Sequence, residues 1–109
     1  MIDKTAKIRE LNDRLRITGK GGRIVITGSL SQASQEEQIM VASKVRSFKD
    51  FNEDNDPHGE HDFGRITIGD TAYNWKIDYY DLSEERGSDR PEDPVVTVRI
   101  LSIFYADDY

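Results

Sequence analysis

A short segment near the middle of the chain gathers most of the side chains that could do chemistry. Residues 55–64 read Asn-Asp-Pro-His-Gly-Glu-His-Asp-Phe-Gly, so that His58 and His61 stand three positions apart among three acidic residues. Two imidazoles and a carboxylate are a ligand set that suits zinc, iron or manganese. The spacing is weakly specific, because a loop does not force the two rings to converge as a helix would. We therefore expect no cofactor and keep His58 and His61 as candidate metal ligands.

The same segment also fits a structural role. Asp56-Pro57-His58-Gly59 has Asp first, Pro second and Gly fourth, which are favoured residues of a type I turn. Asn55 and Asp56 can accept hydrogen bonds from nearby loop amides through their side chains. Both interpretations of the segment stay open at the level of sequence.

Alternating residues after this segment predict a β-hairpin formed by residues 61–68 and 71–80, with Gly69-Asp70 as a type II′ turn. The two-residue turn fixes the register, and His61 then faces Asp78. A His–Asp pair can be the orienting half of a nucleophilic triad, which makes these two residues the candidate catalytic pair. No Ser can be placed against the pair from the sequence, and a cross-strand salt bridge is the simpler interpretation.

The register also decides which side chains the hairpin buries. It places Ile66, Ile68, Tyr73, Trp75 and Ile77 on one face, whereas a slip of one residue would split that set. The Trp75 ring can cover the bare backbone of Gly64. The opposite face is polar and aromatic, and includes Phe63 and Tyr80. We expect this second face to contribute to function.

The remaining patterns predict two helices and two further strands. An amphipathic helix is expected over residues 3–16, a short strand over 23–27, a second helix beginning at Ser31 or Ser34, and a strand over 94–105. The last strand is apolar on both faces, which is typical of a central strand, and the tail after it is expected to fray.

These elements predict an α+β fold in one domain over residues 1–109. We expect two helices packed on one face of a mainly antiparallel sheet of about four strands, in the order α-β-α-β-β-β.

The charge is unevenly distributed along the chain. Residues 1–23 hold seven basic and three acidic side chains, whereas residues 24–109 hold eight basic and eighteen acidic ones. An acidic body repels phosphate, so direct nucleic-acid binding is not expected unless the basic N-terminal helix binds alone. We expect instead a protein partner with a basic surface, which the acidic side chains would attract.

The composition excludes Cys-based chemistry and argues against a membrane-spanning or secreted protein. The absence of Cys excludes disulfides, thiolate metal sites and Cys nucleophiles. No apolar run approaches the ~20 residues of a membrane span, and the N-terminus lacks the apolar centre of a secretory signal. The sequence therefore predicts a cytoplasmic protein.

Several of these motifs together resemble a known bacterial family, domain of unknown function 3768. The resemblance rests on Arg9-Glu10-Leu11-Asn12-Asp13, on residues 55–64, on Trp75-Lys76-Ile77-Asp78-Tyr79-Tyr80-Asp81 and on Val98-Arg99-Ile100-Leu101. The family brings no established activity. It implies a small acidic proteobacterial protein, often carried on plasmids and other mobile genetic elements.

Charge and resemblance together favour a small acidic interaction module. We expect an inhibitor of a nucleic-acid-binding host defence complex, of the anti-CRISPR or anti-restriction type, whose carboxylates mimic phosphates. The expected partner-binding residues lie in two acidic loops and on the hairpin: Asp50, Glu53, Asp54, Asp56, Glu60, Asp62, Phe63, Tyr80, Asp81, Glu84, Glu85, Glu92 and Asp93.

The alternative is a small metal-assisted hydrolase or nuclease that uses His58, His61, Asp62 and Asp78. An unpaired edge of the hairpin could also join a second copy in a homodimer.

Overall fold

The computed structural model describes residues 3–108 and confirms the α+β fold. The elements follow one another as α1 (Lys4–Thr18), β1 (Arg23–Ile26), η1 (Gly28–Gln32), α2 (Gln35–Arg46), β2 (Phe63–Ile68), β3 (Thr71–Tyr80) and β4 (Val98–Tyr105). The four strands form one sheet in the order β1-β4-β3-β2. The sheet is mixed, because β1 runs parallel to β4 while the other two pairs are antiparallel.

Both helices begin at a residue whose side chain caps the first turn. The Asp3 side chain accepts a hydrogen bond from the Ala6 amide at the start of α1, and Ser34 does the same for the Glu37 amide at the start of α2. Gly19, with φ of 77°, ends α1 in the left-handed conformation that glycine adopts without strain. Both helices therefore begin on a local signal, and α1 also ends on one.

The hairpin keeps its predicted register over β2 and β3. Gly64 lies opposite Trp75, Ile66 opposite Tyr73 and Ile68 opposite Thr71. A Cβ at Gly64 would collide with the indole of Trp75 and the ring of Phe48, so only glycine fits under the tryptophan. The predicted core side chains of the hairpin face α1 and α2 and pack with Leu15, Val41, Val45, Leu101 and Ile103.

β4 is the central strand, between β1 and β3, as its two-sided apolar pattern predicts. It begins at Val98 rather than Pro94, and Val95 is 77% exposed in the preceding loop. The prediction of a frayed tail is wrong for residues 106–108. The Ala106 amide donates to the Ala72 carbonyl at 2.9 Å, and the Asp108 carboxylate accepts from the Ser29 amide at 2.7 Å.

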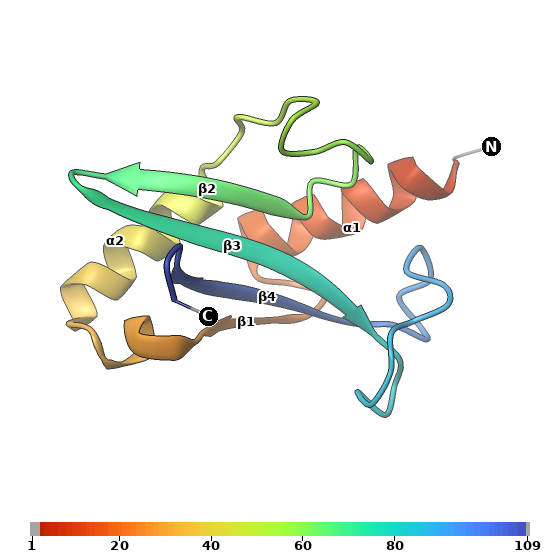
Figure 1. Ribbon diagram of the computed structural model, residues 1–109. Coiled ribbons are helices and arrows are strands. Elements are labelled where there is room, and N and C mark those ends of the chain that lie inside the picture. The colour runs from red at the N-terminus through yellow and green to blue at the C-terminus, as the bar shows by residue number, and fades with distance from the viewer. Residues whose placement is uncertain (1–2, 109) are drawn as a thin grey trace.

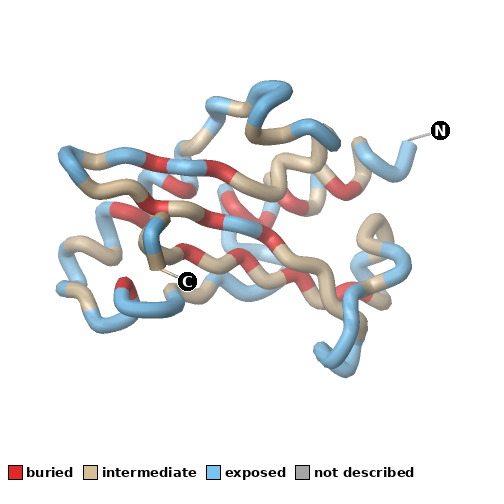
Figure 2. Tube along the Cα trace, viewed as in Figure 1, coloured by how far each residue is buried: buried red, intermediate tan, exposed pale blue. Residues whose placement is uncertain are grey.

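Both helices lie on one side of the sheet, and the other side is open (Figure 1). Buried positions alternate with exposed ones along β2 and β3, as expected for a sheet covered on one face (Figure 2). The outer edge of β2 has no neighbouring strand among residues 3–108, so the homodimer remains a prediction. Within the same residues no helix is long and apolar enough to cross a bilayer.

Candidate functional site

The segment 49–62, here called the first acidic loop, folds back onto α1. Arg9 of α1 donates to the Gly59 carbonyl at 2.9 Å, and the Asn12 amide group donates to the Glu60 carbonyl at 3.0 Å. The predicted turn forms, since the Gly59 amide donates to the Asp56 carbonyl at 3.1 Å. Much of the 55–64 motif thus shapes the loop and docks it on the helix.

His61 is the centre of this docking. Its Nδ1 lies 2.9 Å from the Asp13 carboxylate of α1, and its Nε2 lies 3.6 Å from the carboxylate of Asp56. The imidazole stacks on the Phe51 ring with centroids 3.8 Å apart and planes 4° from parallel. The backbone of His61 is left-handed, with φ of 56°, which is uncommon for a residue other than glycine.

The predicted pairing of His61 with Asp78 is wrong. Strand β2 starts at Phe63, and the left-handed backbone of His61 turns its side chain to Asp13 on the helical side. Asp78 instead pairs with Lys76 at 3.1 Å and lies opposite Ile100 in the sheet. Because the two residues have different partners on different elements, the structure does not bring the candidate catalytic pair together.

The histidines of the alternative hydrolase site have different surroundings. His58 is exposed, while His61 is engaged with Asp13 and Asp56. Among residues 3–108 no three His, Asp or Glu side chains are arranged to hold a metal ion. The contacts of His61 and Asp56 dock the segment on α1.

A second group of contacts forms a buried hydrogen-bond network beneath the first acidic loop. Asn12 is fully buried, and its amide nitrogen also donates to the Tyr79 hydroxyl at 2.8 Å. That hydroxyl donates to the Glu60 carboxylate at 2.7 Å. The Asn12 carbonyl oxygen accepts from Arg99 Nε at 2.8 Å, so one amide side chain satisfies three neighbours.

The network extends through Arg99 to the segment 81–97, here called the second acidic loop. Arg99 is buried in β4, lies over the Tyr79 ring, and donates to the carbonyl of Pro91. One set of buried contacts thus joins α1, both acidic loops and the central strands. We call Asn12, Glu60, Tyr79 and Arg99 the Asn12 network.

Burial is the main cause of the shifted pKa values of Tyr79 and Arg99 in the network and of Asp62 beside it. Burial, followed by the hydrogen bond to Glu60, raises the pKa of Tyr79 above its ordinary value, so the hydroxyl remains a donor. Burial lowers the pKa of Arg99, against the attraction of Tyr79 and Glu60. Asp62 is half-buried, and its pKa is raised first by burial and then by the neighbouring charge of Glu60.

The other predicted partner-binding carboxylates differ in what they contact. Asp50, Glu53 and Asp54 are exposed on the first acidic loop, as is Glu85 on the second. In the second loop Glu84 pairs with Arg23 of β1, while Glu92 and Asp93 lie near Arg90. Asp81 accepts from Ser83 at 2.6 Å. Phe63 and Tyr80 are partly buried on the open side of the sheet.

The sequence analysis missed the polar residues of α1 and β4 that build the network. Arg16, like Asn12, lies on the buried side of α1, where its guanidinium donates to the Phe48 carbonyl at 2.7 Å and contacts the Phe51 and Trp75 rings. Arg99 occupies a core-facing position in β4, on the same face as Leu101 and Ile103. A charged residue at such a position is a readable signal, because burial requires partners.

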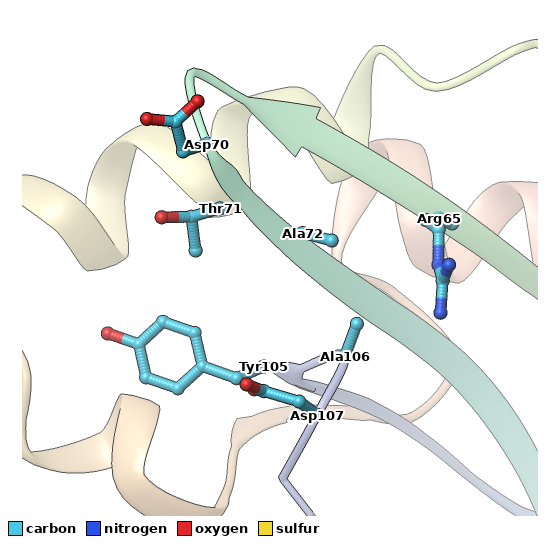
Figure 3. A pocket seen from close by; sticks show the side chains of 7 residues that line it. All are labelled: Arg65, Asp70, Thr71, Ala72, Tyr105, Ala106 and Asp107. Carbon is cyan, nitrogen blue, oxygen red and sulfur yellow. The ribbon is translucent and has the colours of Figure 1, made fainter.

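A groove at the opposite end of the molecule lies apart from these residues. Figure 3 shows the hairpin turn, the end of β4 and the tail around it, with the Tyr105 ring extending away from Asp107. Arg65, Asp70 and Asp107 give its lining both signs of charge. Its residues contribute nothing to the Asn12 network.

A comparison with models of protein families shows to which family the chain belongs. A family model described as "Protein of unknown function (DUF3768)" matches residues 26–108. The chain belongs to this family. The DUF3768 match covers the motifs at residues 55–64, 75–81 and 98–101 that carry the resemblance, whereas the α1 motif lies before it. Neither the curated proteins nor the solved structures yielded a match to the chain.

Proposed function

We propose that this DUF3768 protein is a non-catalytic interaction module of the cytoplasm that inhibits a nucleic-acid-binding host defence complex. Its carboxylates would take the place of phosphates on a basic surface of that complex. The observation that carries the proposal is the Asn12 network, which ties both acidic loops to one frame. One residue of each acidic loop, Glu60 in the first and Pro91 in the second, is thereby attached to the same network.

Topology places the two loops at the same end of the sheet. The first acidic loop leads into β2, and the second connects β3 to β4. Because both strand pairs are antiparallel, β2 and β4 begin beside the end of β3 (Figure 1). The last residues of the first acidic loop therefore lie beside the start of the second, and we propose that one partner contacts both loops.

The tip of the first acidic loop is held in shape by its own side chains. The Asn52 side chain accepts from the amides of Asp54 and Asn55, and the Asn55 side chain donates to the Asp50 carbonyl at 2.8 Å. Asp50, Glu53 and Asp54 point outward from this frame and form no ion pair within residues 3–108. Carboxylates fixed on an ordered loop lose little entropy on binding, which favours recognition of cations.

The contacts of the motif support the same function. His61, Asp56 and Glu60 form contacts that fold the first acidic loop. The exposed carboxylates of the loop are therefore the groups available to bind a partner. No specific contact favours the hydrolase, because His61 and Asp78 have separate partners. An interaction module needs only the charge, shape and order that these residues supply.

The experiment is capture of the partner from a host lysate with the tagged protein, at low and at high salt. The proposal predicts a nucleic-acid-binding complex that is retained at low salt and released at high salt, since exposed charge pairs are screened. The captured complex should also lose affinity for its nucleic acid when the protein is added.

A matched pair of variants locates the surface. Glu53→Gln/Asp54→Asn removes two charges from the loop tip and should weaken capture at least tenfold. Asp70→Asn/Asp107→Asn removes two exposed charges at the opposite end and should leave capture unchanged. Equal effects of the two variants, or capture that is insensitive to salt, would refute the proposal.

A further inference from the structure

The outer edge of β2 carries backbone groups that β3 does not use. The Ile77 amide donates to the Asp62 carbonyl at 2.8 Å, so the even-numbered residues of β2 continue the hydrogen-bonded pairs with β3. The backbone N–H and C=O groups of Phe63, Arg65 and Thr67 therefore point away from β3. No turn, loop or cap hydrogen bond within residues 3–108 involves these groups. We call this row of groups the β2 edge.

The β2 edge lacks the usual protection of an exposed strand. Natural sheet edges commonly carry charged side chains, proline or bulges, because a bare edge pairs with other chains. The charged residue of β2 is Arg65, and its Nε donates to the side chain of Asn74 on β3 at 3.2 Å. Figure 3 shows this side chain pointing from β2 across the sheet. Ile66, Thr67 and Ile68 are β-branched, which favours extended pairing.

A hollow lies between α2 and the end of the hairpin, next to the last residue of β2. Its lining includes Glu36 and Met40 of α2, and Ile68 and Tyr73 of the hairpin. Met40 is 39% exposed, and its flexible thioether side chain adapts to apolar partners of different shape. The side chains of a strand added to β2 would alternate between the open side and the helical side of the sheet. An apolar side chain on the helical side, beside Ile68, would border this hollow.

Acidic residues flank both ends of β2. Residues 49–70 hold seven acidic and two basic side chains, the basic ones being Lys49 and Arg65. The first acidic loop, with Glu53 and Asp54 exposed, leads into β2 and rises on the side of β2 that faces away from β3 (Figure 1). Asp70 is exposed in the turn at the other end of the strand. The surroundings of the β2 edge therefore attract cations.

This charge favours a different partner over a second copy of the chain. In an antiparallel pair of two β2 strands, the turn of each copy would lie beside the start of β2 in the other. Asp70 of one copy would then lie towards the first acidic loop of the other, and like charges repel. An extended segment with basic side chains meets attraction at both ends of β2 instead.

We infer that the β2 edge binds an extended segment of a partner protein, in which basic and apolar side chains alternate, as an additional strand of the sheet. The free backbone groups of Phe63, Arg65 and Thr67 supply the hydrogen bonds of such strand addition. The hollow beside Met40 takes an apolar side chain, and the flanking acids select the basic ones. The inference rests on the proposed function only for the identity of the partner.

The test is amide hydrogen exchange of the full-length protein with a synthetic peptide of alternating lysine and valine, about as long as β2. The peptide should slow exchange at the Arg65 and Thr67 amides about tenfold or more, because these amides gain partners, and should leave the amides of β1 unchanged. A peptide of alternating glutamate and valine should bind about tenfold more weakly or less. Unchanged exchange at both amides, or equal binding of the two peptides, would overturn the inference.

Two substitutions of Thr67 form a matched pair. Thr67→Pro removes an N–H that β3 does not use, so the pairing of β2 with β3 is kept, whereas Thr67→Ala retains that N–H. The proline variant should bind the lysine–valine peptide about tenfold more weakly, and the alanine variant like the wild type. Met40→Lys, on the surface of α2, should also weaken binding by charge repulsion. Circular dichroism checks the fold of each variant, and equal binding by both Thr67 variants would overturn the inference.

Lysate capture with the same two variants separates this inference from the proposed function. A nucleic-acid-binding complex retained equally by Thr67→Pro and Thr67→Ala would overturn the inference and leave the proposed function standing. Loss of that complex with Thr67→Pro alone would support both. If the wild type captures no such complex, the proposed function fails, while protection of the Arg65 amide by the peptide still supports the inference. A dimer in solution that Thr67→Pro abolishes would overturn the inference in favour of a second copy.

Discussion

The two acidic loops have similar composition, yet they are held in different ways. The first is fixed by partly buried, directional contacts: His61 lies between Asp13 and Asp56, and Glu60 accepts from Tyr79. In the second, several carboxylates pair with exposed arginines on the surface. Its buried attachment comes from Arg99, which donates to the Pro91 carbonyl.

This difference separates two uses of a carboxylate. A buried carboxylate that accepts a hydrogen bond defines where the chain goes, because leaving its partner unsatisfied costs free energy. An exposed ion pair contributes little to stability and is screened by salt. The first acidic loop is therefore a preformed surface, while the arginine-paired acids of the second can exchange their partners for those of a bound protein.

The largest expected loss of stability follows substitution of Asn12, the α1 residue at the centre of the Asn12 network. Asn12→Ala removes the hydrogen-bond partner of the Glu60 carbonyl and of Arg99 Nε and the donor to the Tyr79 hydroxyl, and should lower the free energy of unfolding by about 3 kcal/mol. Urea unfolding measures the change. Asn74→Ala, which removes an amide bonded to the exposed Arg65, is the control and should cost less than about 1 kcal/mol. Equal costs would show that the Asn12 network does not hold the loops.

A smaller effect is expected from Tyr79→Phe, which keeps the ring beneath Arg99 and removes only the hydroxyl. The loss should be about 1–2 kcal/mol at neutral pH. Since the native fold raises the pKa of Tyr79, its hydroxyl contributes stability below the ordinary value of 10.0 and loses that contribution as the pH rises above it. The difference between wild type and variant, followed by unfolding at neutral and alkaline pH, should therefore shrink in alkali. A constant difference would contradict the role of the neutral hydroxyl.

The docking of the first acidic loop can be loosened locally. His61→Ala removes the contact with Asp13 and the stack on Phe51, and should speed hydrogen exchange at the Asp56 and Gly59 amides about tenfold or more. Amides of α2 serve as the internal reference. His58→Ala, which removes an exposed imidazole from the same segment, should leave exchange unchanged. A comparable effect of the two changes would contradict the central position of His61.

The smallest effect is expected in the second acidic loop. Glu84→Gln breaks the exposed pair with Arg23 and should leave the thermal midpoint unchanged within error. Differential scanning calorimetry at low and high salt measures it. A marked loss at low salt would mean that this pair fastens the loop, and the contrast between the two loops would then disappear.

Local rules predicted most of the fold. The two-residue turn at Gly69-Asp70 and the alternation along the hairpin each act over a few residues, and both are confirmed; of the two predicted starts of the second helix, Ser34 is the one that forms. The parallel pairing of β1 with β4 was not predicted, because nothing local to Arg23–Ile26 shows which strand it joins.

The site was predictable only in part, because its contacts join distant segments. Extending the hairpin register to residue 61 placed His61 opposite Asp78. The backbone of His61 is left-handed, which ends that register, and the sequence did not indicate this because the residue is not glycine. Asn12, Asp13 and Arg99 act through partners more than forty residues away or in another element. Their polar character at buried positions was visible in the sequence, but their partners were not.

The most direct test of the account is hydrogen exchange of Asn12→Ala under strongly native conditions, with α2 as the internal reference. The account predicts faster exchange in both loops, at the Gly59 and His61 amides of the first and at the Asp81 and Ser88 amides of the second. Faster exchange confined to the first loop, with the second unchanged, would contradict a single network that holds the two acidic loops together.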